Sequence, residues 1–163
     1  MQFEIMMDHL MDNSKNRDKK NKRIEIKNKN IRVFVADDHQ PMLEMVVKLL
    51  TPHYEVVGTA VDGKRALELI RLLKPEIAVL DISMPFKTGI EIAADLQTSG
   101  SQVKVVIITA NVDEFYVRAA IDAGASGFVV KTRLGVQLLP AIESAFADKS
   151  FPSLDDKPTS DLN

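Results

Sequence analysis

Five short apolar segments alternate with five segments of helical periodicity between Ile31 and Ala147, and this alternation restricts the fold more than any other feature. The apolar segments have strand length and contain little polar alternation, which is typical of strands buried on both faces. Parallel strands need helical crossovers, and right-handed crossovers leave few topologies. The sequence therefore predicts an α/β fold, a doubly wound parallel sheet with helices on both faces. The expected strands are 31–36, 54–59, 77–80, 103–108 and 127–130.

The ends of the chain differ in composition from this central part. Residues 1–30 hold 8 Lys or Arg against 5 Asp or Glu, a net charge of +3, and the other 133 residues hold 13 against 18, a net charge of −5. We expect a basic, disordered extension over 1–30, a single domain over 31–147 and a disordered tail over 148–163. A basic arm that touches acidic lipid or nucleic acid is the less favoured alternative for the extension.

Composition also excludes several classes of function. The 163 residues include no cysteine, which rules out disulfides, thiolate metal sites and cysteine nucleophiles. No apolar run reaches the length of a membrane span, and the first residues lack the pattern of a signal peptide. A cytoplasmic protein is the expectation, and the acidic balance of the domain speaks against direct nucleic-acid binding.

Local signals place the helix ends. Thr88 and Glu91 form a capping-box pattern, and Asp62 and Asp113 are predicted to open two further helices. Gly124 is predicted to end a helix, whereas Pro140 falls inside the last helical pattern and should kink it or mark a late start. Five side chains are expected in the core because of their spacing: Phe34, Met42, Met45, Phe115 and Phe146.

Three carboxylates follow strands that a doubly wound sheet brings together. Asp37 and Asp38 follow the first strand and Asp81 ends the third, at the edge of the sheet where ligands bind. Carboxylates that lie so close repel one another unless a cation sits among them. With oxygen ligands alone, a hard ion is implied, Mg²⁺ before Ca²⁺.

Lys131 at the end of the fifth strand adds a positive charge, and Thr109 at the end of the fourth adds a hydroxyl. Together with a carboxylate and a metal ion, these groups meet the demands of phosphoryl transfer, in which a carboxylate can be the nucleophile. An ion pair between Asp81 and Lys131 that only stabilises the fold is the alternative, and it leaves the acid pair unexplained.

These residues resemble the receiver domain of two-component response regulators. The resemblance covers about Ile31 to Ala147 and rests on five short motifs, each at a predicted strand end. The runs Ala36-Asp-Asp-His39 and Ala123-Gly-Ala-Ser-Gly-Phe128 resemble most the receivers that precede a LuxR-type helix-turn-helix. The resemblance implies a flavodoxin-like (βα)5 fold with strand order 2-1-3-4-5.

The resemblance also implies a role for each matching residue. Asp81 would accept a phosphoryl group from a histidine kinase, a phosphotransfer protein or a small donor. Mg²⁺ would be held by Asp37, Asp38, Asp81 and the backbone carbonyl of Ser83. Lys131 would pair with the phosphoryl group, and Thr109 would bind it and draw in the loop that begins at Ala110. Phe128 stands where an aromatic ring turns inward, without the hydroxyl of the common tyrosine. Ser83 and Asn111 match positions that tune dephosphorylation.

The expected function is a phosphorylation-controlled switch rather than an enzyme acting on a separate substrate. Its readout surface would be the fourth helix, fifth strand and fifth helix, with a downstream protein or a second copy of the chain as partner. Only 16 residues follow Ala147, too few for a helix-turn-helix domain, which favours a stand-alone receiver. A fragment of a transcriptional regulator, a binding module that works without phosphorylation and a small-molecule phosphatase are the alternatives.

Overall fold

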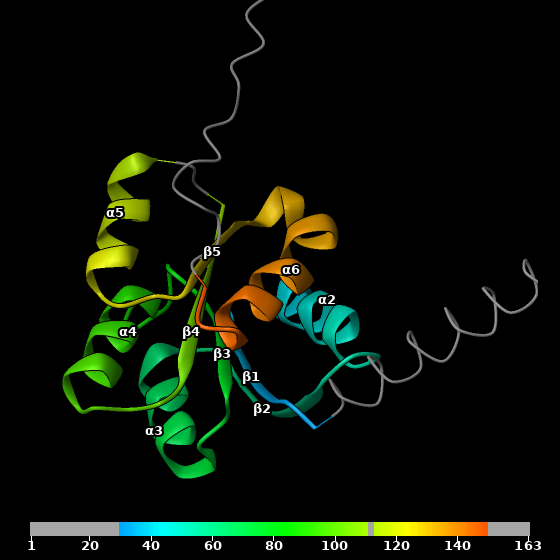
Figure 1. Ribbon diagram of the computed structural model, residues 1–163, viewed down its shortest axis with the longest axis horizontal. Helices are drawn as coiled ribbons and strands as arrows, with labels where there is room; N and C mark the ends of the chain where they lie inside the picture. Colours follow the sequence, from blue (N-terminus) through cyan, green and yellow to red (C-terminus); the bar gives the residue numbers. More distant parts are fainter. Residues whose placement is uncertain (1–29, 111–112, 150–163) are drawn as a thin grey trace, which may run out of the picture.

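The computed structural model describes residues 30–110 and 113–149, and these form a five-stranded parallel sheet. The strands pair in the order β2-β1-β3-β4-β5, as the sequence predicted (Figure 1). Because the order reverses between β1 and β3, the loops that follow these two strands meet at one edge of the sheet. The bounds are β1 (Arg32–Ala36), β2 (Glu55–Ala60), β3 (Ile77–Asp81), β4 (Lys104–Thr109) and β5 (Gly127–Val130).

Helices cover both faces of the sheet. The pair α2 and α6 packs on one face, and α3, α4 and α5 pack on the other (Figure 1). A short 3-10 helix, η1, leads from β5 into α6. The bounds are α2 (Gln40–Leu50), α3 (Gly63–Leu73), α4 (Gly89–Thr98), α5 (Glu114–Asp122), η1 (Lys131–Arg133) and α6 (Leu134–Phe146).

The central strand β3 divides the core into two hydrophobic clusters. Ile77 and Val79 face the cluster under α2 and α6, whereas Ala78 and Leu80 face the cluster under α3, α4 and α5. Successive side chains of a strand point to opposite faces, so a strand between two helical layers must be apolar at every position. All five residues of β3 are buried and the first four are apolar, which is why its sequence shows no alternation; Asp81 ends the strand at the edge of the sheet.

The predicted helix ends are confirmed. Thr88 Oγ1 accepts a hydrogen bond from the Glu91 amide at 3.1 Å, and the Glu91 carboxylate accepts one from the Thr88 amide at 2.7 Å, which completes the capping box. Asp62 and Asp113 each accept a hydrogen bond from a backbone amide in the first turn of their helix. Gly124 follows the end of α5 with φ 84°, a left-handed conformation that suits glycine.

Several predictions about packing are wrong. Phe34 is buried as expected and Met42 is partly buried, but Met45, Phe115 and Phe146 are exposed. In α2 the buried residues are Leu43, Val46 and Leu50, a stripe displaced from the face that carries Met42 and Met45. The helix is apolar around most of its circumference, so periodicity alone did not select the buried face.

Four of the five strands differ from prediction by one residue at one or both ends. The second strand begins at Glu55 rather than Tyr54, whose side chain is nevertheless buried in the cluster under α2 and α6. The last helix begins at Leu134, so Pro140 lies within it and marks no late start. Within residues 30–110 and 113–149, no helix combines the length and apolarity that a membrane span requires.

Candidate functional site

Three carboxylates meet at the carboxyl edge of the sheet, where the sequence placed them. One carboxylate oxygen from each of Asp37, Asp38 and Asp81 lies within 4.8 Å of the other two. Asp37 is fully buried and Asp81 is only 4% exposed, whereas Asp38 is open to solvent. The cluster therefore contains two buried acids, Asp37 and Asp81, and one solvent-accessible acid, Asp38.

Lys131 compensates part of this negative charge. Its ammonium nitrogen lies 2.8 Å from Asp37 Oδ2 and 3.3 Å from Asp81 Oδ1. The lysine opens η1 directly after β5, and its side chain is largely buried. One cation thus bridges two acids that come from strands β1 and β3. Three carboxylates and one ammonium leave the pocket with a formal charge of −2.

Burial and neighbouring charges have opposing effects on Asp81 and Lys131, and the net result is a raised pKa for both groups. Burial, together with the neighbouring Asp37, raises the pKa of Asp81 to about 6, although Lys131 pulls it in the other direction. Burial alone would lower the pKa of Lys131, but its contacts with Asp37 and Asp81 outweigh that effect and raise the pKa. Lys131 therefore stays charged, whereas ionisation of Asp81 costs free energy in the folded protein.

The donor set fits a hard divalent cation. Asp37 Oδ1 accepts a hydrogen bond from the His39 amide at 2.9 Å, which fixes the carboxylate. Asp37 Oδ2 is buried and lacks a well-aligned hydrogen-bond donor among the described residues, although the Lys131 ammonium lies close to it. Such under-satisfied carboxylate oxygens, grouped without nitrogen or sulfur ligands, are what Mg²⁺ or Ca²⁺ takes up.

Comparison with known proteins identifies the kind of domain to which this pocket belongs. The family model described as "Response regulator receiver domain" matches residues 33–143, more than half of the chain. The chain belongs to this family. The resemblance deduced from the sequence motifs is therefore confirmed, together with the fold and the strand order.

Proteins similar to this chain differ in overall length. The transcriptional regulatory protein DegU of Brevibacillus brevis is 33% identical over 73% of this receiver chain and 51% of its own. Protein CcdB of Bacillus subtilis is 35% identical over 68% of the chain and 93% of its own. The signal receiver domain of the response regulator NarL from Mycobacterium tuberculosis superimposes with a TM-score of 0.69 at 34% identity, covering 73% and 98% of the two chains.

Most of the first curated relatives are longer than the matching region. This receiver chain spans about half to three fifths of their length, from 51% for DegU to 60% for the transcriptional regulatory protein DesR of Bacillus subtilis. The functions of these longer relatives as whole proteins are therefore not assigned to this chain.

The remaining predicted residues of the receiver lie around the pocket in different settings. Thr109 ends β4 and is buried, and Phe128 is buried in β5 within the cluster under α3, α4 and α5. Ser83 is exposed in the loop after β3, and Ala110 is exposed directly after β4. Asn111 lies outside the described residues. Their roles in binding and switching stay predictions.

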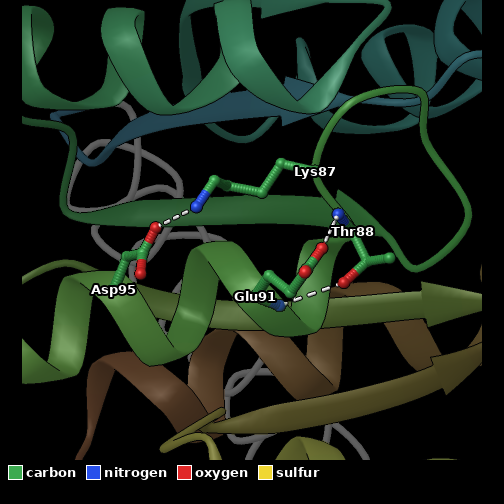
Figure 2. A network of polar contacts seen from close by, with 4 residues as sticks. All are labelled: Lys87, Thr88, Glu91 and Asp95. Carbon is green, nitrogen blue, oxygen red and sulfur yellow. Dashed lines mark hydrogen bonds and ion pairs between the residues drawn. The ribbon is translucent and has the colours of Figure 1, made fainter.

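Sequence reasoning missed the residues that hold the loop between β3 and α4. A Cβ on Gly89 would lie 2.3 Å from the backbone oxygen of Asp81, and one on Gly63 would lie 1.7 Å from the backbone oxygen of Lys87. Lys87 also forms an ion pair with Asp95 of α4, beside the Thr88–Glu91 capping box (Figure 2). The capping box was the signal in the sequence, whereas the two close backbone approaches depend on the tertiary fold.

Proposed function

We propose that this receiver accepts a phosphoryl group on Asp81, from a sensor histidine kinase, a phosphotransfer protein or a small phosphodonor. The observation that carries the proposal is the placement of Asp81 between a lysine and two further acids at the carboxyl edge of the sheet. In the reaction, an Asp81 oxygen forms a bond to phosphorus as the P–N bond of a phosphohistidine breaks. The departing imidazole takes up a proton, and the product is an aspartyl phosphate.

Mg²⁺ is the proposed cofactor. Asp37, Asp38 and Asp81 would hold it, with the backbone carbonyl of Ser83 as a further ligand. The ion would neutralise charge on the phosphoryl oxygens, which is the main demand of phosphoryl transfer. Asp38 is the exposed member of the acid cluster and is therefore the acid through which an ion could enter from solvent.

Lys131 is proposed to stabilise the product. Its ammonium already lies 3.3 Å from an Asp81 oxygen, so it can follow the negative charge that phosphorylation adds there. Because the same ammonium contacts Asp37, a shift toward the phosphoryl group weakens an existing ion pair. Phosphorylation would in this way alter contacts between β1, β3 and β5.

The proposed output is a change in the surface formed by α5, β5 and α6. Thr109 would bind the phosphoryl group, and Phe128 would rearrange with it, which biases a two-state equilibrium of the domain. A downstream protein, or a second copy of the phosphorylated chain, would bind this surface. The protein would act in the cytoplasm, as a switch rather than as an enzyme with a separate substrate.

A second candidate differs in the output. DegU and DesR, which are similar to this chain over little more than half of their own lengths, are named transcriptional regulatory proteins. The receiver is therefore proposed either as a stand-alone switch, as the sequence favoured, or as the receiver half of a transcriptional regulator.

Intact mass spectrometry after incubation with acetyl phosphate and Mg²⁺ tests the phosphoacceptor. Wild type should gain the mass of one phosphoryl group, and Asp81→Ala should gain none. Asp122→Asn, which removes an exposed carboxylate of α5, is the matched control and should be labelled like wild type.

Two results would contradict the proposal. If neither acetyl phosphate nor a panel of phosphorylated histidine kinases labels the folded wild type, the domain works as a binding module without phosphorylation. If the protein instead hydrolyses p-nitrophenyl phosphate over many turnovers, it is a phosphatase.

A further inference from the structure

A pocket lies at the amino edge of the sheet, opposite to the acidic cluster. Its volume is about 570 Å³, within the range of roughly 300–1,000 Å³ that is usual for ligand pockets. Lys74 and Glu76 line it directly before β3, Lys104 lines it at the start of β4, and Phe146 lines it at the end of α6. The proposed phosphorylation uses none of these residues, so the pocket calls for a separate explanation.

Apolar side chains form part of the lining. Ile70 of α3 and Leu96 of α4 are buried, and Val103, directly before β4, is partly buried. Phe146, the last residue of α6, also lines the pocket but is 52% exposed. An apolar occupant would remove part of this ring and of the neighbouring apolar surface from water, which is favourable.

The lining is also basic. Arg71 and Lys74 at the end of α3 and Lys104 at the start of β4 stand against a single acid, Glu76, which gives the lining a formal charge of +2. The Glu76 carboxylate accepts a hydrogen bond from the Arg32 amide at 2.8 Å and is therefore engaged within the domain. The pocket thus favours an occupant that carries negative charge next to its apolar groups.

The described part of the chain ends beside this pocket. After α6 the backbone turns, because the Lys149 amide donates a hydrogen bond to the Ser144 carbonyl at 2.8 Å and Asp148 has φ 57°. The Asp148 carboxylate forms an ion pair with Lys104, a residue of the lining. An exposed ion pair of this kind adds little stability, but it fixes where the following segment begins. Residues 150–163 lie outside the described part of the chain.

The sequence that follows has the chemistry that the pocket favours. Phe151 and Leu154 are its first apolar residues, and Asp155 and Asp156 come directly after them. Residues 150–156 therefore combine two apolar side chains with a formal charge of −2, against a lining of +2. Leu154 is the fifth residue of this segment, and five residues reach up to about 18 Å, more than the width of a compact cavity of this volume.

Attachment favours this segment over an occupant from another molecule. A tethered segment does not have to associate from solution, and its effective concentration beside its point of attachment reaches the millimolar range. A second copy of the chain would need a much larger contact, since a stable interface buries about 800 Å² on each partner. A cavity of 570 Å³ accommodates a few side chains, which is what a short segment provides.

We propose that residues 150–156 fold back and occupy the pocket at the amino edge of the sheet. Phe151 and Leu154 would contact its apolar lining, and Asp155 and Asp156 would neutralise its basic residues. The inference does not depend on phosphorylation. Docking would hold the segment that follows α6 at the edge of the sheet opposite to the acidic cluster.

A spin label in the segment tests this inference in the full chain. Because the protein contains no cysteine, Ser153→Cys provides a single attachment site for a nitroxide. In amide NMR spectra, the signals of Arg71 and Lys74 should lose most of their intensity with the oxidised label and regain it when the label is reduced. The Lys48 signal, from the end of α2 on the other face of the sheet, should not change.

Two sets of variants, made in the spin-labelled parent, distinguish docking from mere proximity. Phe151→Ser combined with Leu154→Ser should restore the signals of Arg71 and Lys74, while the thermal unfolding transition of the domain persists. Arg71→Glu should restore the Lys74 signal in part. Lys48→Glu is the matched control, because it reverses a charge in the last turn of α2 as Arg71→Glu does in the last turn of α3, and it should have no effect.

Three results would overturn the inference. The first is full intensity of the Arg71 and Lys74 signals with the oxidised label. The second is an equal loss of intensity in the parent and in the variant that lacks Phe151 and Leu154. The third is the same loss when the spin label is on a separate copy of the chain, mixed with an isotope-labelled copy that has no spin label, because the segment would then bind a second molecule.

Discussion

Asp81 shows how a single side chain can be useful and costly at once. Its carboxylate is buried next to Asp37, and these two effects raise its pKa from 3.8 to about 6 despite the contact with Lys131. An acid whose pKa is raised by folding binds protons more strongly in the native than in the unfolded protein. Native stability is then highest when the acid is protonated and falls as the pH rises through the interval between the two pKa values.

We therefore expect Asp81→Asn to be more stable than wild type at pH 7.5 without divalent ions. Asparagine imitates the neutral acid, and a pKa shift from 3.8 to about 6 corresponds to a gain of at most about 3 kcal/mol. The gain should vanish at about pH 3 and below, where the carboxyl is protonated in both states. Urea unfolding in EDTA at the two pH values measures it, with Asp122→Asn as control. Equal stability at pH 7.5 would show that the pocket does not penalise the Asp81 charge.

Gly89 sets the position of Asp81 in a different way, through the absence of a side chain. A Cβ there would meet the Asp81 backbone oxygen at 2.3 Å, so Gly89→Ala must displace either β3 or the start of α4. We expect a loss of about 1–3 kcal/mol in the free energy of unfolding, as for other overpacked sites. The rate of labelling by acetyl phosphate should fall as well.

Gly135→Ala is the matched control for Gly89→Ala. It lies in α6, and a Cβ there meets no heavy atom within 4 Å. Alanine should stabilise that helix by up to about 1 kcal/mol and leave labelling unchanged. Chemical unfolding of both variants gives the comparison, and effects of the same sign would refute the packing argument.

At the scale of helices and strands, α6 contains a conflict between sequence and structure. Pro140 is its seventh residue, and it removes the hydrogen bond that a backbone amide would make to the Val136 carbonyl. The helix nevertheless runs from Leu134 to Phe146, because Leu138, Ala141, Ile142 and Ala145 are fully buried against the sheet. Tertiary packing outweighs the local preference of one residue.

Pro140→Ala should accordingly stabilise the domain by about 2 kcal/mol, since the helix regains a hydrogen bond while the unfolded chain gains some freedom. The exposed Pro52 lies in the turn after α2, and Pro52→Ala should be neutral or slightly destabilising there. Thermal and urea unfolding of both variants test this. A destabilised Pro140→Ala would mean that the proline ring makes contacts on which α6 depends.

The same scale shows what the sequence could predict. The doubly wound sheet, the helix caps and the meeting of Asp37, Asp38, Asp81 and Lys131 followed from periodicity, capping chemistry and the rules of parallel sheets. The full strand order followed from the resemblance to receiver domains. The exposure of Met45 and Phe115 could not be predicted, because an apolar residue next to a buried stripe looks like part of that stripe. The left-handed backbone conformation of Phe86 could not be predicted either, because it depends on how the loop between β3 and α4 packs against Gly63.

For the whole molecule, the acid cluster would couple the proposed binding of a cation to folding. The acids come from β1 and β3 and the lysine from the end of β5, so the site exists only when the sheet is assembled. A ligand that binds the native state alone raises its stability according to concentration. Mg²⁺ at 100 times its Kd should thus add about 2.7 kcal/mol.

Differential scanning calorimetry with and without Mg²⁺ checks this expectation. The unfolding temperature of wild type should rise with Mg²⁺ and return on addition of EDTA. Asp38→Asn changes an exposed side chain, so it should fold but respond much less. Asp122→Asn should respond like wild type. An equal response of Asp38→Asn would place the cation elsewhere.

The division of the core by the sheet has a consequence for the direction in which a signal travels. Phe128 packs among α3, α4 and α5, while α6 rests on a separate cluster behind the strands. A reorientation of this ring would therefore repack the layer beneath α5 and leave the support of α6 intact. A partner that binds this surface would then contact α5 in a changed position and α6 in an unchanged position.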